Sequence, residues 1–208
     1  MPTLEIESAH STLAVGNSGG PDSTCLLFLI NKLLTDLRSK AMTRHPMPTS
    51  VVSLSVNHNL QESSHSMAAR SAANADAMGI EHLTLEIPWG TPPFSAKPTT
   101  GQAMEQTARE ARYHAVFNGM TRTGALSVAF GHHADDQVET SLMRLARGTT
   151  ELGAGGMRRH RRWGMGTGDV EDGLGWVGHH GLNRWIVRPF LDVRKVGAVH
   201  LHDPSVIC

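Results

Sequence analysis

The stretch Ser18-Gly19-Gly20-Pro21-Asp22-Ser23 decides the fold, because of what lies on either side of it. The apolar run Thr12–Val15 precedes it and is typical of a buried strand. After it, leucines recur at three- and four-residue steps, as on one face of an amphipathic helix. Glycines in such a turn let backbone N–H groups approach phosphate oxygens, and the helix N-terminus attracts anions. We therefore predict a phosphate-binding loop over residues 18–23, with Ser18 and Ser23 as hydroxyl donors.

Asp22 adds a negative charge to this predicted phosphate site. A carboxylate among phosphates would repel them unless a cation lay between, so Asp22 predicts a bridging Mg²⁺. The alternative is an ordinary glycine-rich turn in which Asp22 or Ser23 caps the helix. The loop is not a Walker A motif, and no dinucleotide pattern of the type GxGxxG is present.

Strand and helix patterns alternate along the first three quarters of the chain. Further strands are predicted at Val51–Val56, at Ala125–Phe130, at Trp185–Val187 and, as an edge strand, at His82–Ile87, and further helices at Ser64–Met78, Gln102–Met120 and Asp135–Ala146. This alternation predicts an α/β fold with a doubly wound parallel sheet. We expect one catalytic domain over residues 10–150, followed over 151–208 by a loop region rich in Gly and Arg with an irregular tail.

The overall composition excludes several classes of protein. The 208 residues include 19 basic and 19 acidic ones, so a nucleic-acid partner would have to bind a local patch. The two cysteines form no CxxC motif, which excludes a zinc finger, a four-cysteine iron–sulfur cluster and a thioredoxin-type centre. The longest apolar run, 25–30, is too short to span a bilayer, so no membrane is expected. The oligomeric state cannot be predicted from the sequence.

A second group of polar residues follows the predicted strand at 125–130. It contains His132, His133, Asp135 and Asp136, where the next helix begins. Two adjacent carboxylates beside two histidines exceed what helix capping needs. They could share a metal with Asp22, because ligands bind at the carboxyl edge of such sheets, and Asp22 and Asp135 are the expected metal ligands. In the alternative interpretation Asp135 caps the helix and the histidines are structural.

Two sets of arginines are candidates for binding anions. Arg109 and Arg112 share one helical face and could meet phosphate or RNA, or could instead form surface salt bridges with nearby glutamates. The densest basic run is Arg158-Arg159-His160-Arg161-Arg162-Trp163. We predict that its four arginines bind RNA backbone and that Trp163 stacks on an unpaired base. The alternative is a solvated charged loop.

The hexapeptide resembles the PP-loop of the N-type ATP pyrophosphatases, which cleave ATP between the α- and β-phosphates. The series Gly131–Thr140, Arg144–Gly148 and Gly155–Met157 (GHHADDQVET, RLARG and GGM) resembles the tRNA(Ile)-lysidine synthetase family, as do Val56–Leu60, Ala108–Tyr113 and Arg188–Leu191. The resemblance covers roughly residues 12–195 and implies the adenine nucleotide alpha hydrolase-like fold.

This resemblance also implies a reaction. In the first step, ATP bound with Mg²⁺ adenylates the wobble cytidine of an isoleucine tRNA with the anticodon CAU. In the second step, free lysine displaces AMP to give lysidine. The catalytic candidates are Asp22, Asp135, Asp136, His133, Arg109 and Arg112, the ATP-binding residues are Ser18, Gly19, Gly20, Pro21, Asp22 and Ser23, and the tRNA-binding residues are Arg158, Arg159, Arg161 and Arg162. Such an enzyme acts in the bacterial cytoplasm or in an organelle such as the mitochondrion. The first ten residues contain no clear targeting segment.

The sequence departs from the family pattern at four places. Asn57 and Gln61 replace an Asp and an Arg, and Gly16-Asn17 reads as an insertion before the loop. The segment between Leu191 and Asp203 is shorter than in the family, which predicts truncation after the catalytic domain. The alternative function is therefore a degenerate or truncated nucleotide-binding paralogue without ligase activity. Among other PP-loop enzymes, the tRNA 2-thiolation enzymes use cysteine clusters that this chain lacks.

Overall fold

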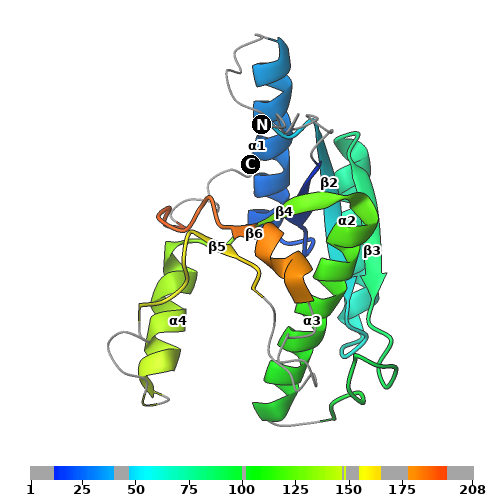
Figure 1. Ribbon diagram of the computed structural model, residues 1–208, viewed down its shortest axis with the longest axis vertical. Helices are drawn as coiled ribbons and strands as arrows, with labels where there is room; N and C mark the ends of the chain where they lie inside the picture. The colour runs from blue at the N-terminus through cyan, green and yellow to red at the C-terminus, as the bar shows by residue number, and fades with distance from the viewer. Residues whose placement is uncertain are drawn as a thin grey trace, which may run out of the picture.

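The computed structural model describes residues 12–39, 47–99, 102–146, 148, 155–164 and 178–195. At its centre is a six-stranded sheet with the strand order β3-β2-β1-β4-β6-β5 (Figure 1). The strands are β1 (Thr12–Gly16), β2 (Ser50–Asn57), β3 (Glu81–Glu86), β4 (Ala125–Phe130), β5 (His160–Arg162) and β6 (Trp185–Val187). The first four and β6 pair in parallel, and β5 pairs antiparallel to β6. The predicted parallel α/β sheet is confirmed, and β3 lies at its edge as expected.

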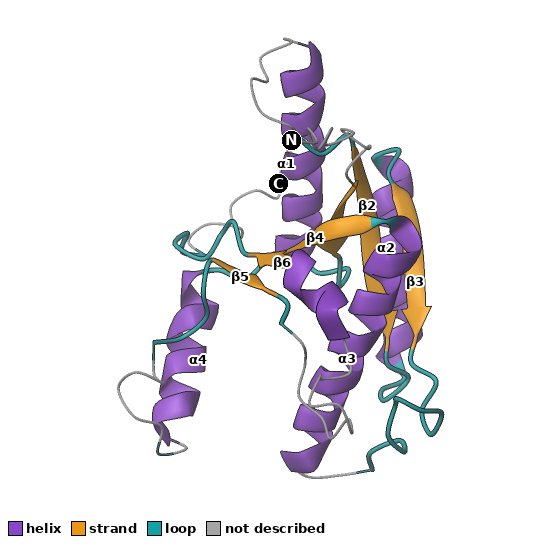
Figure 2. Cartoon of the chain, viewed as in Figure 1, coloured by secondary structure: helices purple, strands orange, loops and turns teal. Residues whose placement is uncertain are grey.

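Four α-helices connect the strands (Figure 2). They are α1 (Pro21–Ser39), α2 (Ser63–Ala77), α3 (Gln102–Thr123) and α4 (Ala134–Ala146), and a 3₁₀ helix, η1, spans Gly178–Asn183. All four helices lie where the sequence patterns predict them, with boundaries that differ by a few residues. Helix α2 ends at the C-cap Met78, and the next residue, Gly79, has a φ of 65°, a left-handed conformation that glycine adopts without strain.

Apolar cores cover both faces of the sheet, which makes it doubly wound. Ala14 and Val128 face α3, where they pack with Val116 and Met120. Their neighbours Val15 and Ala129 point to the opposite face and pack with residues of α1 and α2. Adjacent strand residues thus enter different cores, as the pleat requires. Because both faces are covered by helices, the carboxyl edge of the sheet is the place left for ligands.

The region predicted as loop after residue 150 contributes to the sheet and to the core. Strand β5 and η1 were not expected there. Trp163 is only 6% exposed, and its ring packs against those of Tyr113 and Phe117. The prediction that Trp163 stacks on an unpaired base is therefore wrong, because its ring is part of the protein core. The glycine-rich stretch 165–177 and the segment 203–205 lie outside the described residues.

Helix α4 differs from the other helices because none of its residues is buried. It extends away from the sheet (Figure 1), and the apolar face that its sequence predicts is open, with Val138, Leu142 and Leu145 between 52% and 61% exposed. In the described part of the chain, no helix is long and apolar enough to cross a membrane.

Candidate active site

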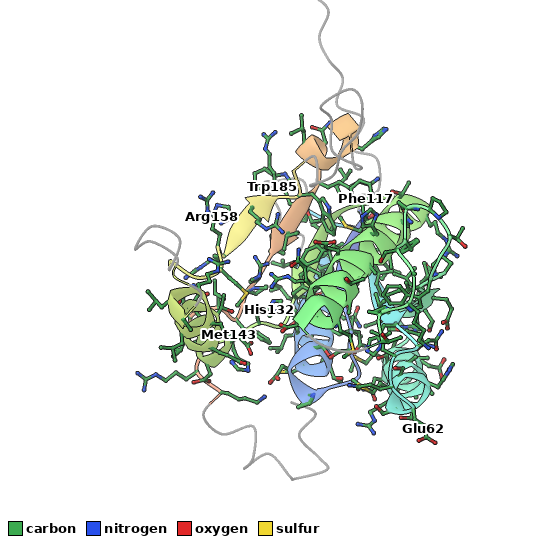
Figure 3. All side chains as sticks on the ribbon, turned by 90° about the horizontal axis from the view of Figure 1, so that it is seen from below. Glu62, Phe117, His132, Met143, Arg158 and Trp185 are labelled. Atoms are coloured by element: carbon green, nitrogen blue, oxygen red, sulfur yellow. The ribbon has the colours of Figure 1, made fainter. Side chains whose placement is uncertain are left out.

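The carboxyl ends of three neighbouring strands bring the candidate residues together. The loop 18–23 follows β1, residues 131–136 follow β4, and Arg188 follows β6 directly. Figure 3 shows the molecule of Figure 1 from below and places His132 between α4 and α3. The predicted meeting of the two polar motifs at this edge is confirmed by the contacts of His133 with Asp22, described below.

The phosphate-binding loop is held by hydrogen bonds within itself. The backbone N–H of Ser18 donates to Ser23 Oγ at 3.1 Å, and the Ser23 hydroxyl lies 3.1 Å from the carbonyl oxygen of Gly20. Gly19 has a φ of 76°, and a Cβ atom there would lie 2.8 Å from the carbonyl oxygen of Met67. Only glycine fits this turn, because both the conformation and the close approach exclude a side chain.

Asn17 fixes this loop to the body of the protein, a role that the sequence did not reveal. Its buried side-chain oxygen accepts hydrogen bonds from the Gly19 N–H at 3.0 Å and the Ser23 hydroxyl at 3.3 Å. Its amide nitrogen donates to Ser53 Oγ and to the Ser71 carbonyl, both at 3.2 Å. Gly16 and Asn17 do not separate the strand from the loop, since Gly16 is the last residue of β1 and the Asn17 N–H continues the pairing with Leu54.

An acidic cluster of Asp22, Asp135 and Asp136 surrounds His133. The Nε2 atom of His133 lies 3.8 Å from Asp22 Oδ2, and its Nδ1 atom lies 3.5 Å from one oxygen each of Asp135 and Asp136. The backbone N–H of His133 donates to Asp136 Oδ2 at 2.8 Å, a reciprocal capping arrangement that begins α4. His133 therefore takes part in the helix cap with Asp136 and also contacts Asp22.

Lys195, which lies outside the sequence motifs, contacts this cluster. Its ammonium donates to Asp22 Oδ2 at 3.0 Å, and its backbone N–H donates to Asp135 Oδ2 at 2.8 Å. The hydrogen bond and the charge of Asp22 raise the pKa of Lys195 above its usual value. The cluster therefore binds a primary ammonium group in the protein itself.

The acidic cluster could hold a metal ion only in part. In the described residues, no group of three or more His, Cys, Asp and Glu side chains has the geometry of a complete metal site. Asp22 and Asp135 do lie near the same imidazole ring, that of His133, at 3.8 and 3.5 Å. Two carboxylates with further oxygens from nucleotide phosphates are a usual environment for Mg²⁺. The residues present therefore fit a metal ion that binds together with a nucleotide.

A second, positively charged cluster lies beside the first. It consists of Arg109 and Arg112 from α3, Arg161 from β5 and Arg188 after β6, and we call it the arginine cluster. The guanidinium carbons of Arg109 and Arg161 lie 6.0 and 5.9 Å from the centre of the Tyr113 ring. The charges of Arg161 and Arg188 also act on the Tyr113 hydroxyl. Burial raises the pKa of Tyr113, but the charges of Arg109, Arg188 and Arg161 together bring it below its usual value.

None of the four arginines forms an ion pair with a carboxylate in the described residues. The alternative of salt bridges between Arg109 or Arg112 and the glutamates of their helix is thus not realised. Glu110 instead accepts a hydrogen bond from Gln106 at 3.0 Å. The positive charge of the cluster is therefore open to a ligand.

The basic run at 158–162 is not one uniform surface. Arg161 points to Tyr113, whereas the guanidinium of Arg162 lies on the outer side, 5.2 Å from the centre of the Trp185 ring. Arg159 is exposed and forms an ion pair with Asp192, and Arg158 is exposed. The strand alternation of β5 divides the run between two sides of the molecule.

His132 lies between the arginine cluster and the acidic cluster. Burial and the nearby Arg188 charge lower the pKa of His132 to about 4, so its ring is neutral at pH 7. Its Nδ1 atom is buried and has no hydrogen-bond partner among the described residues. His132 and His133 thus differ in role, since His133 contacts carboxylates and His132 faces arginines.

Asn57, at the end of β2, is almost fully buried and donates to Glu86 Oε1 at 3.0 Å. The other Glu86 oxygen accepts from Asn59 at 2.9 Å. The family motif has Asp where this chain has Asn57. A carboxylate is still present beside this position, but it belongs to Glu86 at the end of β3. For Gln61, the structure shows a backbone N–H 3.4 Å from Ser64 Oγ at the start of α2.

The profile of the PP-loop domain family matches residues 3–200. The chain belongs to the PP-loop domain family. It is also 35% identical over 163 residues to the tRNA(Ile)-lysidine synthase of Alkalilimnicola ehrlichii and 32% identical over 193 residues to that of Bacillus subtilis. The resemblance to this group of PP-loop proteins is confirmed.

These matches cover most of the chain but a small part of each relative. They span 78% and 91% of the chain, but 32% and 34% of the two synthases, so the chain corresponds to about a third of their length. Among solved structures, the U34-tRNA thiolase NcsA from Methanococcus maripaludis superposes with a TM-score of 0.59 at 17% identity, over 89% of this chain and 54% of that chain. This likeness confirms the fold.

Proposed function

We propose that this PP-loop protein is an ATP-dependent ligase that converts the wobble cytidine of an isoleucine tRNA with the anticodon CAU to lysidine. The observation that carries the proposal is the ammonium of Lys195, which binds Asp22 directly beside the phosphate-binding loop. A site that accepts a primary ammonium next to an ATP phosphate site has both features that the reaction needs. The tRNA(Ile)-lysidine synthase names of the relatives support the same activity.

In the first step, the C2 carbonyl oxygen of cytidine attacks the α-phosphate of ATP, and pyrophosphate leaves. The backbone N–H groups of Gly20 and Ser23 and the hydroxyls of Ser18 and Ser23 would hold the departing pyrophosphate at the N-terminus of α1, while Gly19 and Pro21 would shape the turn. Mg²⁺, held by Asp22 and Asp135 together with the phosphates, would neutralise their charge. Arg109 and Arg112 would contact phosphate near the reacting atoms.

In the second step, an unprotonated amine of lysine attacks C2, the bond between C2 and the adenylate oxygen breaks so that AMP leaves, and the amine releases one proton to solvent. Asp22, Asp135 and Asp136 would bind and orient an ammonium group of the lysine, and His133 contacts all three carboxylates, at 3.8 Å for Asp22 and 3.5 Å for the other two. Bringing amine, cytidine and phosphate into one geometry accounts for much of the rate increase that such a site can supply. The exposed Arg158, Arg159 and Arg162, with Arg161, would bind the tRNA backbone.

The experiment that tests this proposal is AMP formation from ATP and Mg²⁺, with and without lysine and the CAU-anticodon isoleucine tRNA. We expect AMP release that requires both substrates and is lost in Asp22→Ala. A folded protein that binds ATP but forms no AMP would instead be the nucleotide-binding paralogue without ligase activity. Arg122→Gln, at the far end of α3, is the control and should keep full activity.

A further inference from the structure

The arginine cluster gathers positive charge from three elements that are far apart in sequence. Arg109 and Arg112 lie on α3, Arg161 on β5 and Arg188 directly after β6. Like charges repel each other, and no carboxylate among the described residues pairs with any of the four. A fold that brings these charges together around one tyrosine favours an anion as the missing partner.

Arg188 shows that this arrangement is built into the fold and is not a chance surface feature. Arg188 is only 3% exposed, and its Nη1 atom donates a hydrogen bond to the Arg158 carbonyl at 2.8 Å. Its Nε atom is buried without a hydrogen-bond partner in the described part of the chain. A buried guanidinium with an unused donor is costly unless a ligand completes its hydrogen bonds.

We propose that the arginine cluster, with Tyr113 and His132, is a phosphate-binding site separate from the loop at 18–23. A planar guanidinium matches the oxygens of a phosphate group in two parallel hydrogen bonds, and several guanidiniums can share one phosphate. His132 adjoins His133, which contacts Asp22, so the site lies next to the acidic cluster. A phosphate at this place would belong either to RNA backbone or to the nucleotide. The choice of RNA probe below rests on the proposed function.

Tyr113 makes this site directly observable, because it is the single tyrosine of the chain. A bound anion would offset the surrounding positive charge and raise the pKa of Tyr113, which a spectrophotometric titration of the phenol measures. We expect inorganic phosphate to raise the pKa in the intact protein and in Ser18→Ala, whose change lies in the other phosphate site. In the double variant Arg109→Gln/Arg161→Gln the pKa should start higher and should not respond to phosphate. A response that is lost in Ser18→Ala but kept in the double variant would overturn the proposal, as would no response at all.

Two binding measurements then distinguish the sources of the phosphate. One is the affinity for an RNA hairpin with the anticodon CAU, without lysine or ATP, and the other is the affinity for Mg²⁺ and ATP without RNA. If RNA backbone is the ligand, Arg109→Gln and Arg161→Gln should each weaken RNA binding and lower the slope of log Kd against log salt by about one, with ATP binding unchanged. If the nucleotide is the ligand, the loss appears in the ATP measurement.

Arg122→Gln on the same helix is the matched control and should change neither affinity. Equal affinities of all variants for both ligands would overturn the phosphate site. Arg188 is left unchanged in these tests, because its hydrogen bond to the Arg158 carbonyl also supports the fold. None of these measurements depends on AMP formation. A failure of the ligase proposal and a failure of the phosphate site therefore give different results.

Discussion

At the scale of single residues, Asn17 is the side chain on which the phosphate-binding loop most depends. It is 2% exposed and joins the loop to β2 and α2 by four side-chain hydrogen bonds. Removing one partner from a buried network leaves the remaining groups without compensation. The two bonds to the loop also fix the orientation of the Gly19 N–H and the Ser23 hydroxyl. The loop needs this orientation to bind phosphate.

We therefore expect Asn17→Ala to lower the free energy of unfolding by about 2 kcal/mol and to weaken ATP binding. Urea denaturation measures the first effect and equilibrium dialysis with labelled ATP the second. Asn118→Ala, at an exposed position of α3, is the control and should stay within about 0.5 kcal/mol of the original protein. Unchanged ATP affinity in Asn17→Ala would mean that the loop keeps its shape without this anchor.

The residues of the loop itself could be predicted from the sequence, whereas Asn17 could not. A strand, a glycine turn and a helix follow each other directly, so Ser18 to Ser23 are recognisable from local order. The partners of Asn17 lie 36 and 54 residues away, at Ser53 and Ser71, and no local pattern indicates them. Lys195 was missed for the same reason, since its partner Asp22 is 173 residues away.

At the scale of elements, sequence patterns predicted all four helices and five of the six strands in the described residues, but they failed for β5. This strand consists of His160, Arg161 and Arg162, and three basic residues have no strand pattern. It forms because β6 offers a free edge and because Trp163 follows it into the core. Periodicity also predicted the apolar face of α4 correctly, but such a pattern does not say whether another element covers that face.

Trp163, which follows β5, and Trp185, the first residue of β6, should therefore differ in their effect on stability. Trp163 is 6% exposed and packs against Tyr113 and Phe117, whereas Trp185 is 36% exposed. We expect Trp163→Ala to lower the free energy of unfolding by about 3–5 kcal/mol, as a large cavity in a core does. Trp185→Ala serves as the matched variant and should have a clearly smaller effect. Equal losses in thermal or urea unfolding would contradict the placement of Trp163 in the core.

At the scale of the whole molecule, a net charge of zero conceals two clusters of opposite sign at one edge of the sheet. The acidic cluster lies at the ends of β1 and β4, and the arginine cluster lies at the end of β6 with α3 and β5 beside it. His132 and His133 are adjacent residues, and each faces one of the two clusters. Composition alone could exclude binding by bulk charge, but the separation of charge depends on the strand order.

Lys195 connects the segment after β6 to the loop after β1, and its role in the reaction can be separated from its role in stability. The ammonium and Asp22 side chains are 48% and 32% exposed, so water screens their attraction, and the pair should add less than about 1 kcal/mol to the free energy of unfolding. In the proposed reaction, however, the same ammonium competes with the lysine substrate for the acidic cluster. A bound competitor raises the substrate concentration that the enzyme needs.

Lys195→Ala should therefore leave the unfolding midpoint in urea nearly unchanged while it lowers the lysine concentration needed for half-maximal AMP formation. Arg194→Ala changes a neighbouring exposed charge and should alter neither quantity. If Lys195→Ala instead abolishes AMP formation in a folded protein, the ammonium contacts a substrate and does not compete with one. The acidic cluster would then need Lys195 to balance its three carboxylates before it can accept the phosphates of ATP, and the lysine substrate would have to bind elsewhere along the same edge of the sheet.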